Sequence, residues 1–227
     1  AVVVESTRRT PVRHCVDVLV VGAGPAGIAA AVSCKRAAPG LAVMCAERFG
    51  FMGGTITQTG MESIHWYRYE GTAELGGFGA ELEKLADKLG ASKKFPYNSS
   101  ACLQPEVFKV VADKLMKEHG VLPLLHSWAV DVTMETQFGQ PTVTGVIFES
   151  KSGRFAVRAR RVVDCTGDGD IAYFSNCPMT VLPTSKRMGV TTVFNVKRVD
   201  GNAFLAHTDA NPATYRDWST AEGEFQQ

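Results

Sequence analysis

A glycine-rich segment near the N-terminus has the residue types and spacing of a phosphate-binding turn. Residues 22–27 read GAGPAG, with glycine at the first, third and sixth positions. Gly22 would permit a tight turn, Gly24 would let the backbone approach a pyrophosphate, and Gly27 would let a helix pack on its strand. The N-terminus of that helix would add free N–H groups and a partial positive charge. The spacing therefore predicts a dinucleotide site.

The segments on either side of this turn fit the same interpretation. Residues 18–21 are apolar and mostly β-branched, as in a strand buried on both faces. Residues 28–38 are rich in Ala and Ile and contain no helix breaker before Pro39. The glycine spacing alone could also be a turn that joins any strand to any helix. The order of strand, turn and helix favours the dinucleotide site.

An acidic residue stands where a nucleotide ribose would be recognised. Residues 41–48, LAVMCAER, predict a second apolar strand that ends at Glu47, 20 residues after Gly27. A dinucleotide fold places an acid there to accept hydrogen bonds from the adenosine ribose. Like-charge repulsion disfavours a 2′-phosphate beside it, so NADP is not expected in this site. A solvated acid at a strand end is the alternative.

Two segments that follow the second strand are candidates for a pocket wall. Gly53 and Gly54 precede Thr55, a pattern typical of a loop that approaches a ligand closely, although a surface turn has the same pattern. Residues 56–70 are rich in Trp, Tyr and His and have no sustained period. His65 is the obvious group there that titrates near neutral pH, so it is the candidate catalytic residue. A packed or exposed histidine is the alternative.

The remaining periodicity predicts two helices, a third parallel strand and a β-meander. Residues 78–89 and 105–120 have the apolar spacing of amphipathic helices, separated by a polar loop over residues 91–104. Residues 121–125 predict the third strand. From 126 to 160 apolar and polar residues alternate with period two, which is typical of antiparallel strands.

The meander leads into a second glycine turn. An apolar strand over residues 161–165 is followed by Thr166, Gly167, Asp168, Gly169 and Asp170, and then by a helical start. The two glycines permit close approach of a ligand to the backbone. Asp168 or Asp170 can accept hydrogen bonds from the hydroxyls of a sugar or sugar alcohol, or cap the helix that follows, and the two roles can coexist.

Composition and charge exclude several classes of protein. A chain of 227 residues with 45% hydrophobic and 21% charged residues is ordinary for a soluble globular protein. A net charge of +1 offers no field for nucleic acid, and no apolar run approaches the ~18 residues of a membrane helix. The six cysteines form no C-x-x-C and mostly lie in apolar patterns, which we interpret as buried thiols in a reducing cytoplasm, with no metal site.

Taken together, these motifs resemble the FAD-dependent oxidoreductases of the two-dinucleotide-binding-domain flavoprotein superfamily, and within it a subfamily with a D-[AC]-T-G-D-G-D motif. The resemblance covers roughly residues 17–198 and depends on DVLVVGAGPAGIAAA, Glu47-Arg48, GGT at 53–55, the meander and VVDCTGDGD. It implies an α/β fold: a Rossmann-like FAD-binding domain with a parallel sheet and β-meander, plus the start of a substrate-binding domain.

The resemblance also implies roles for residues at the adenosine and phosphate end. Glu47 would hold the adenosine ribose, with Arg48 beside it, and the backbone of Val130 would contact adenine. Five residues would line the FAD pyrophosphate: Gly22, Gly24, Pro25, Ala26 and Gly27.

At the flavin end, residues 53–55 would run along the ribityl chain or the isoalloxazine. Thr166, Gly167 and Asp168 would close on the pyrophosphate and the ribityl chain. Cys165 departs from the more usual Ala of this motif, but both residues are small, so we expect no change in the site.

The domain prediction that follows is an FAD-binding domain over 1–180, with the meander at 126–160, and an incomplete substrate-binding region over 181–227. Residues 188–199 would form its first strand, whereas residues 200–227 contain few apolar residues and no strong period. The segment that returns to the FAD domain in this superfamily is missing. We therefore expect further residues of the same protein, or a second chain, to complete the flavin site, and a homo-oligomer is compatible with this.

The reaction class implied is hydride transfer between an unidentified small-molecule substrate and the flavin. The sequence has no thiol pair for a disulfide-reductase mechanism and no second G-x-G-x-x-G for a separate NAD(P)H domain. Two alternatives stay open, an NAD-dependent dehydrogenase and a noncatalytic flavin- or nucleotide-binding subunit of a larger assembly. Neither nucleic acid nor a membrane is an expected partner.

Overall fold

The computed structural model describes residues 2, 7–61, 76–90, 92–94, 101–187, 192, 194 and 196–211. The chain divides into two compact units, residues 1–179 and 180–227. The first unit contains the sheet and the predicted nucleotide motifs.

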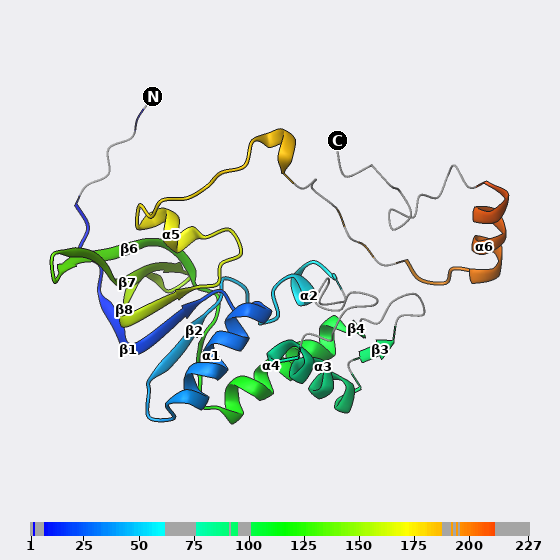
Figure 1. The fold of residues 1–227 in the computed structure, drawn as a ribbon, viewed down its shortest axis with the longest axis horizontal. Coiled ribbons are helices and arrows are strands. Elements are labelled where there is room, and N and C mark those ends of the chain that lie inside the picture. Colours follow the sequence, from blue (N-terminus) through cyan, green and yellow to red (C-terminus); the bar gives the residue numbers. More distant parts are fainter. Residues whose placement is uncertain are drawn as a thin grey trace. The chain divides into compact units, whose positions relative to one another are not determined.

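A single six-stranded sheet organises the first unit (Figure 1). Its first four strands are parallel to one another and its last two are antiparallel to their neighbours. The order across the sheet is β5 (Leu122–Leu124), β2 (Val43–Ala46), β1 (Val12–Val21), β8 (Gly153–Asp164), β7 (Gln140–Ser150) and β6 (Trp128–Gln137). The predicted α/β fold with a parallel sheet and a β-meander is therefore confirmed.

Strands β1 and β8 are longer than their sequence patterns suggest. β1 begins at Val12 rather than near residue 18, and its first half pairs in parallel with the first half of β8. The prediction of a last meander strand followed by a separate strand at 161–165 is wrong, because β8 runs without a break from Gly153 to Asp164. β7 pairs with the first half of β8 and β1 pairs with the rest, so β8 has a hydrogen-bonded neighbour along its whole length. One strand thus joins the meander to the parallel sheet.

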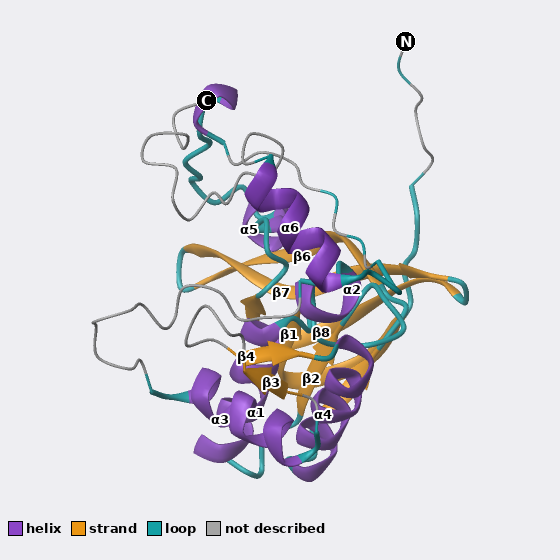
Figure 2. Cartoon of the chain, turned by 90° about the vertical axis from the view of Figure 1, so that its right-hand side faces the viewer, coloured by secondary structure: helices purple, strands orange, loops and turns teal. Residues whose placement is uncertain are grey.

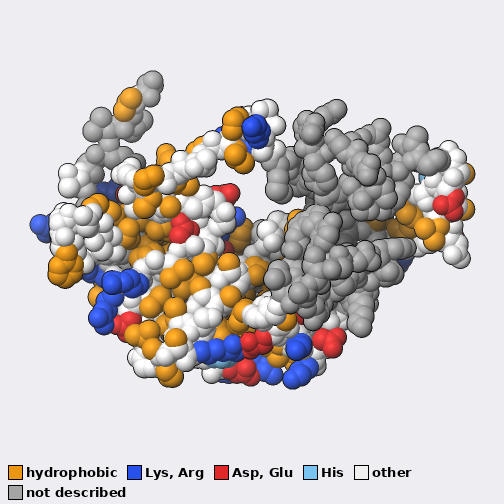
Figure 3. All heavy atoms as spheres, in the orientation of Figure 1, with side chains coloured by type: hydrophobic (Ala, Val, Ile, Leu, Met, Phe, Trp, Pro, Cys, Tyr) orange, Lys and Arg blue, Asp and Glu red, His pale blue; other side chains and the backbone are white. Residues whose placement is uncertain are grey.

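Helices cover one side of the sheet (Figure 2). They are α1 (Pro25–Ala37), α3 (Phe78–Lys88) and α4 (Pro105–Glu118), close to the predicted ranges. Their apolar faces pack on Val18, Val20 and Val43 in one core cluster. A second core cluster packs Leu19 and Val21 against the meander. Figure 3 shows acidic and basic side chains side by side along the edge formed by α3 and α4, as expected for their outer faces.

A charged contact ties the three helices together. Arg36 of α1 donates two hydrogen bonds to the carboxylate of Glu81 on α3, one of them 2.7 Å long. Its Nε also donates to Nε2 of His119, the residue after α4, at 3.1 Å. His119 Nδ1 lies 2.9 Å from the Leu115 carbonyl oxygen, which gives the ring a partner on each side. The hydrogen bonds from Arg36 hold the pKa of the Glu81 carboxyl below its ordinary value.

The predicted polar loop over 91–104 contains secondary structure at both ends. β3 (Ser92–Lys94) and β4 (Ala101–Leu103) pair antiparallel, with Ser92 opposite Leu103. The prediction of a loop is therefore wrong for these residues. Leu103 is fully buried in the core next to the helices.

The second unit contains a short 3-10 turn, η1 (Thr184–Lys186), and helix α6 (Gly201–Ala210). The Asp200 side chain caps α6 by accepting hydrogen bonds from the backbone N–H groups of Asn202 and Ala203. This helix was not predicted, because it buries no residue and so has no apolar period. The predicted strand at 188–199 is also wrong where residues are described: 192, 194 and 196–199 lie in no strand.

The described cysteines only partly match the prediction of buried thiols. Cys45 is buried, Cys34 and Cys165 are half-buried, and Cys15 and Cys177 are exposed. All five are free thiols. Burial raises the pKa of both Cys45 and Cys165, which makes those two thiols poor nucleophiles.

Candidate cofactor-binding site

Two glycines of the first turn are required by the packing of the protein itself. Gly22 directly follows β1 and has φ of 95°, and a Cβ there would lie 2.2 Å from the carbonyl oxygen of Cys165. A Cβ on Gly27 would lie 1.8 Å from the carbonyl oxygen of Gly22. A side chain at position 22 would therefore push the end of β1 away from the residue after β8, and one at position 27 would push α1 away from the first turn, so the packing requires glycine at both positions.

Gly24 differs from both of them. A Cβ on Gly24 would meet its nearest neighbour, the Cα of Gly54, at 3.7 Å, which is ordinary van der Waals contact. Its φ of −70° is available to any residue. Neither packing nor backbone conformation requires glycine here, so the protein keeps an open surface at this point. A pyrophosphate that approaches the backbone closely would need such a surface.

The N-terminus of α1 is open toward the same point. Pro25 is its first residue and has no N–H, and no described side chain caps the helix. The first turn contains no acidic residue. The N–H groups of Ala26 and Gly27 belong to the first turn, which has no intrahelical acceptor for its donors. A helix start of this kind favours an anion.

Glu47 follows β2 and is buried, with 7% of its surface exposed. Its Oε2 accepts a hydrogen bond from the Ala23 N–H at 2.8 Å, and its Oε1 accepts from the Phe49 N–H at 3.1 Å. Each carboxylate oxygen has two lone pairs and can accept one further hydrogen bond. The alternative of a solvated strand-end acid does not describe this residue, and the ribose role stays a prediction.

The loop after β2 returns to the first glycine turn. The Gly53 N–H donates to the Ala23 carbonyl oxygen at 2.8 Å. A Cβ on Gly54 would lie only 2.8 Å from the Cα of Gly24, and Gly54 has φ of 56°. Thr55 begins the four-residue helix α2 (Thr55–Gln58) and is exposed. Residues 53–55 therefore lie beside the first glycine turn.

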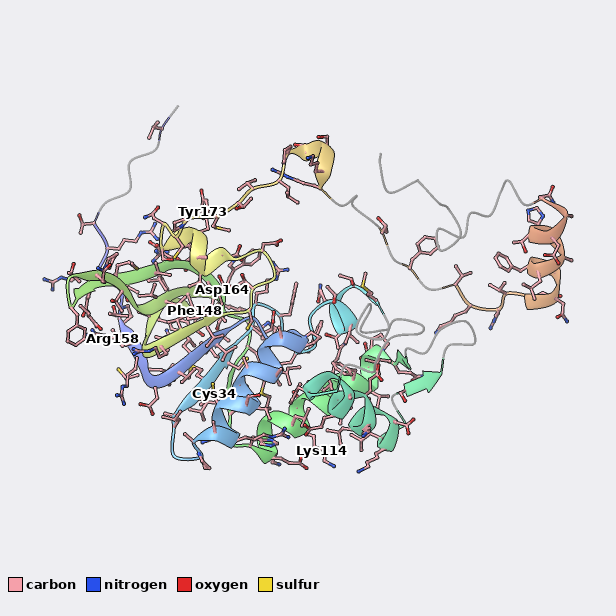
Figure 4. The ribbon with its side chains drawn as sticks, in the orientation of Figure 1. Cys34, Lys114, Phe148, Arg158, Asp164 and Tyr173 are labelled. Carbon is pink, nitrogen blue, oxygen red and sulfur yellow. The ribbon has the colours of Figure 1, made fainter. Side chains whose placement is uncertain are left out.

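The second glycine turn is organised by Asp164, the last residue of β8 (Figure 4). Asp164 Oδ1 accepts from the Thr166 N–H at 3.1 Å and from the Thr166 hydroxyl at 2.7 Å, and Oδ2 accepts from the Ala172 N–H at 3.0 Å. The Thr166 hydroxyl oxygen also accepts from the Asp170 N–H at 2.9 Å. These bonds hold the start of α5 (Asp170–Phe174).

Capping of α5 by Asp168 or Asp170 is therefore wrong, because Asp164 and Thr166 supply the acceptors. Sequence reasoning missed Asp164, although an Asp two residues before a Thr at a strand end is a signal for a side-chain-stabilised turn. Asp168 is exposed on the turn, and Gly167 has φ of 95°. The predicted contact of residues 166–168 with a cofactor stays a prediction.

The start of β6 lies next to the end of β2. The Ser127 N–H donates to the Glu47 carbonyl oxygen, and the His126 N–H to that of Phe49, each at 3.0 Å. The ladder between β6 and β7 shifts register between Ala129 and Asp131, so Val130 has no partner on β7. A bulged residue of this kind has backbone groups outside the ladder. That geometry suits the predicted contact of the Val130 backbone with adenine, and the pattern of residues alone does not reveal it.

Arg48, which follows the end of β2, acts electrostatically on Asp170 in the second glycine turn, which follows the end of β8. The pKa of the Asp170 carboxyl is raised, first by burial and then by the neighbouring charges of Asp168 and Asp164, whereas Arg48 acts in the opposite direction. Arg48 therefore lies within electrostatic range of the second glycine turn, beside Glu47 as predicted. The proposed catalytic residue, His65, lies outside the described residues.

An open hollow of about 490 Å³ lies on this unit. It is lined by residues of β8, α5 and the end of the β6–β7 hairpin, including Val143, Arg161 and Ser175. Asp164 lines it, whereas neither Glu47 nor residues 22–27 do, so the hollow borders the second glycine turn but not the first. Within the described ranges, no group of three or more His, Cys, Asp or Glu could hold a metal ion. Nor does any helix among them have the length and apolar character needed to cross a membrane.

A parallel sheet whose first strand ends in an open glycine turn, with a buried acid after the second strand, defines a Rossmann-type dinucleotide-binding domain. The particular family follows from comparison with known proteins. The family described as FAD dependent oxidoreductase matches residues 17–227, and the chain belongs to it. Its cofactor is FAD. Comparison with curated proteins finds no match.

Solved structures share the fold. Thermovibrio ammonificans THI4 is 19% identical with a TM-score of 0.52, over 70% of this chain and 61% of that one. A geranylgeranyl bacteriochlorophyll reductase-like protein from Thermoplasma acidophilum is 19% identical with a TM-score of 0.53, over 76% and 44%. A flavoprotein/dehydrogenase from Cytophaga hutchinsonii is 20% identical with a TM-score of 0.50, over 71% and 42%. The matched regions thus span less than two thirds of each of these proteins.

Proposed function

We propose that the first unit binds FAD across the two glycine turns, and that the protein transfers a hydride between a small-molecule substrate and the flavin. The observation that carries the proposal is the open surface at Gly24. Glycine is not needed there by the fold, yet the uncapped start of α1 and the buried Glu47 carboxylate face the same turn. Membership of the FAD dependent oxidoreductase family supports the cofactor.

In this proposal each part of the chain has one task. The first-turn N–H groups of α1 hold the pyrophosphate, and Glu47 accepts hydrogen bonds from the ribose hydroxyls. The free backbone of Val130 contacts adenine. Residues 53–55 and 166–168 border the ribityl chain and the ring. When bound, FAD supplies the hydride chemistry, and the protein supplies position and electrostatics.

The catalytic groups and the remaining walls of the site belong to the same proposal. His65 is the candidate proton donor or acceptor beside the flavin. We propose an FAD-binding domain over 1–180 and a substrate-binding region that begins at 181. Further residues of the same protein or a second chain, which includes a homo-oligomer, would complete the flavin site. The free thiols of the described cysteines support a reducing, cytoplasmic location.

The visible spectrum of the purified protein tests the cofactor. We expect flavin absorption, release of FAD on denaturation, and recovery of one FAD per chain on reconstitution. A colourless protein that takes up NAD but not FAD would favour the NAD-dependent dehydrogenase instead. Anaerobic addition of candidate substrates then tests the reaction, because hydride transfer bleaches bound flavin. Bound FAD that no compound of a broad panel bleaches would favour a noncatalytic subunit.

A further inference from the structure

Trp128 stands beside the proposed ribose acceptor and has no role in the site described above. It is the first residue of β6, and 56% of its surface is exposed. The preceding residue, Ser127, is buried and donates its N–H to the Glu47 carbonyl oxygen at 3.0 Å. The backbone that carries the indole is therefore anchored next to Glu47.

One cation links this indole to the loop after β2. The guanidinium carbon of Arg48 lies 5.4 Å from the centre of the Trp128 ring and 4.8 Å from that of Phe49. Both distances are in the range of cation–π contacts. Arg48 is exposed and follows Glu47 directly. An aromatic ring and a planar guanidinium therefore lie together at the edge of the proposed adenosine site.

The loop that carries Arg48 is braced on its other side. The rings of Phe49 and Phe51 stack at 6.1 Å, and Nζ of Lys109 on α4 lies 4.1 Å from the centre of the Phe51 ring. His126 donates its N–H to the Phe49 carbonyl oxygen at 3.0 Å. Aromatic and cationic groups thus follow one another from α4 to Trp128. Arg48 therefore lies over two aromatic rings of the protein, those of Phe49 and Trp128.

We propose that Trp128 and Arg48 form the platform on which the adenine base stacks, and that Trp128 makes the site select FAD over FMN. Aromatic rings and guanidinium planes are the surfaces that bases stack on in proteins. The adjacent unpaired backbone of Val130 would contact the edge of the same base. The inference rests on the proposed function, because it needs the adenosine half of FAD to lie at Glu47.

Calorimetric titration of the full chain with FAD, ADP and FMN tests this platform. FAD and ADP carry the adenosine group, whereas FMN carries the flavin without it. In Trp128→Leu we expect FAD and ADP to bind about tenfold more weakly than in the wild type, because a stacking ring is lost. FMN affinity should stay unchanged. Trp128→Phe, which keeps an aromatic ring, should lie within about threefold of the wild type for all three ligands.

Phe138 provides the matched control, because it is a fully exposed aromatic residue that follows β6 at the far end of the strand. Phe138→Leu should leave all three affinities unchanged. Equal FAD and ADP affinities in Trp128→Leu and the wild type would overturn the platform. An equal loss of FAD, ADP and FMN binding in Trp128→Leu would overturn it as well, since only a damaged fold would weaken all three. A wild-type protein that binds none of them would instead refute the proposed function.

Discussion

The backbones of Gly24 and Gly54 lie in contact, and this contact leaves no room for a side chain at position 54. A Cβ on Gly54 would lie 2.8 Å from the Cα of Gly24, closer than real Cβ atoms approach a backbone atom. A Cβ on Gly24 would lie 3.7 Å from the Cα of Gly54, at ordinary contact distance. The contact is therefore asymmetric, and it separates a glycine needed by the fold from one whose open face is free for a ligand.

This asymmetry predicts different outcomes for Ala at the two positions. Gly24→Ala should lower FAD affinity strongly, because its methyl group would occupy the surface offered to the pyrophosphate, while the unfolding midpoint of the apoprotein changes little. Gly22→Ala should destabilise the apoprotein strongly, because its Cβ would meet the Cys165 carbonyl oxygen. FAD titration and urea unfolding measure the two effects.

Gly40→Ala is the control, since a Cβ there meets nothing within 4 Å. It should change neither affinity nor stability. If Gly24→Ala binds FAD as well as the wild type, the open surface at Gly24 does not receive the pyrophosphate.

Glu47→Gln should weaken FAD binding and also destabilise the apoprotein. Hydrogen bonds to charged groups contribute roughly 1.5–3 kcal/mol, so loss of the charge should lower FAD affinity about tenfold. The amide of Gln also places donors where Glu47 accepts from the Ala23 and Phe49 N–H groups, so one of these bonds is lost. Titration with FAD and urea unfolding report the two losses. Glu118→Gln on the exposed face of α4 should show neither, and normal FAD affinity in Glu47→Gln would exclude the ribose role.

Replacing Asp164 should lower the stability of the protein, whereas replacing Asp168 should weaken its binding of FAD. Asp164→Ala leaves the Thr166 and Ala172 N–H groups without their acceptor, and we expect a loss of about 1–2 kcal/mol in the free energy of unfolding. Asp168→Ala should leave stability unchanged and weaken FAD binding. Chemical unfolding and FAD titration of both variants give the comparison. Equal stability of the two variants would contradict the capping role of Asp164.

The contact between Arg36 and Glu81 predicts a pH-dependent stability. The hydrogen bonds from Arg36 lower the pKa of the Glu81 carboxyl below its ordinary value of 4.5. The folded protein thus favours the ionised carboxylate, and this stabilisation is complete above pH 4.5 and is lost as the pH falls through the lowered pKa. Glu81→Gln should therefore lower the thermal midpoint at neutral pH, and the difference from the wild type should shrink in acid. A difference that does not change with pH would rule out an ionic origin.

The class of protein can be recognised from the sequence alone. The spacing of residues 22–27, the apolar strands around them and the acid at Glu47 are local or nearly local features, and each is legible from residue type and period. The ranges of α3 and α4 follow in the same way, since the apolar spacing of an amphipathic helix indicates its buried face. The range of α1 follows from its Ala- and Ile-rich run, which contains no breaker before Pro39. His65 and the extent of the substrate-binding region stay predictions.

The role of each residue in the site cannot be predicted in this way, because it depends on neighbours that are distant in the chain. Gly24 and Gly22 are the same residue type, and only the positions of Gly54 and Cys165 distinguish the two. The cap on α5 comes from Asp164 rather than from the nearer acids, because β8 continues into the turn and brings its last carboxylate under the helix start. In the alternating sequence pattern of residues 126–160, Trp128 looks like any other strand residue. It meets Arg48 because the backbone of β6 hydrogen-bonds to the end of β2, and no local period encodes that pairing.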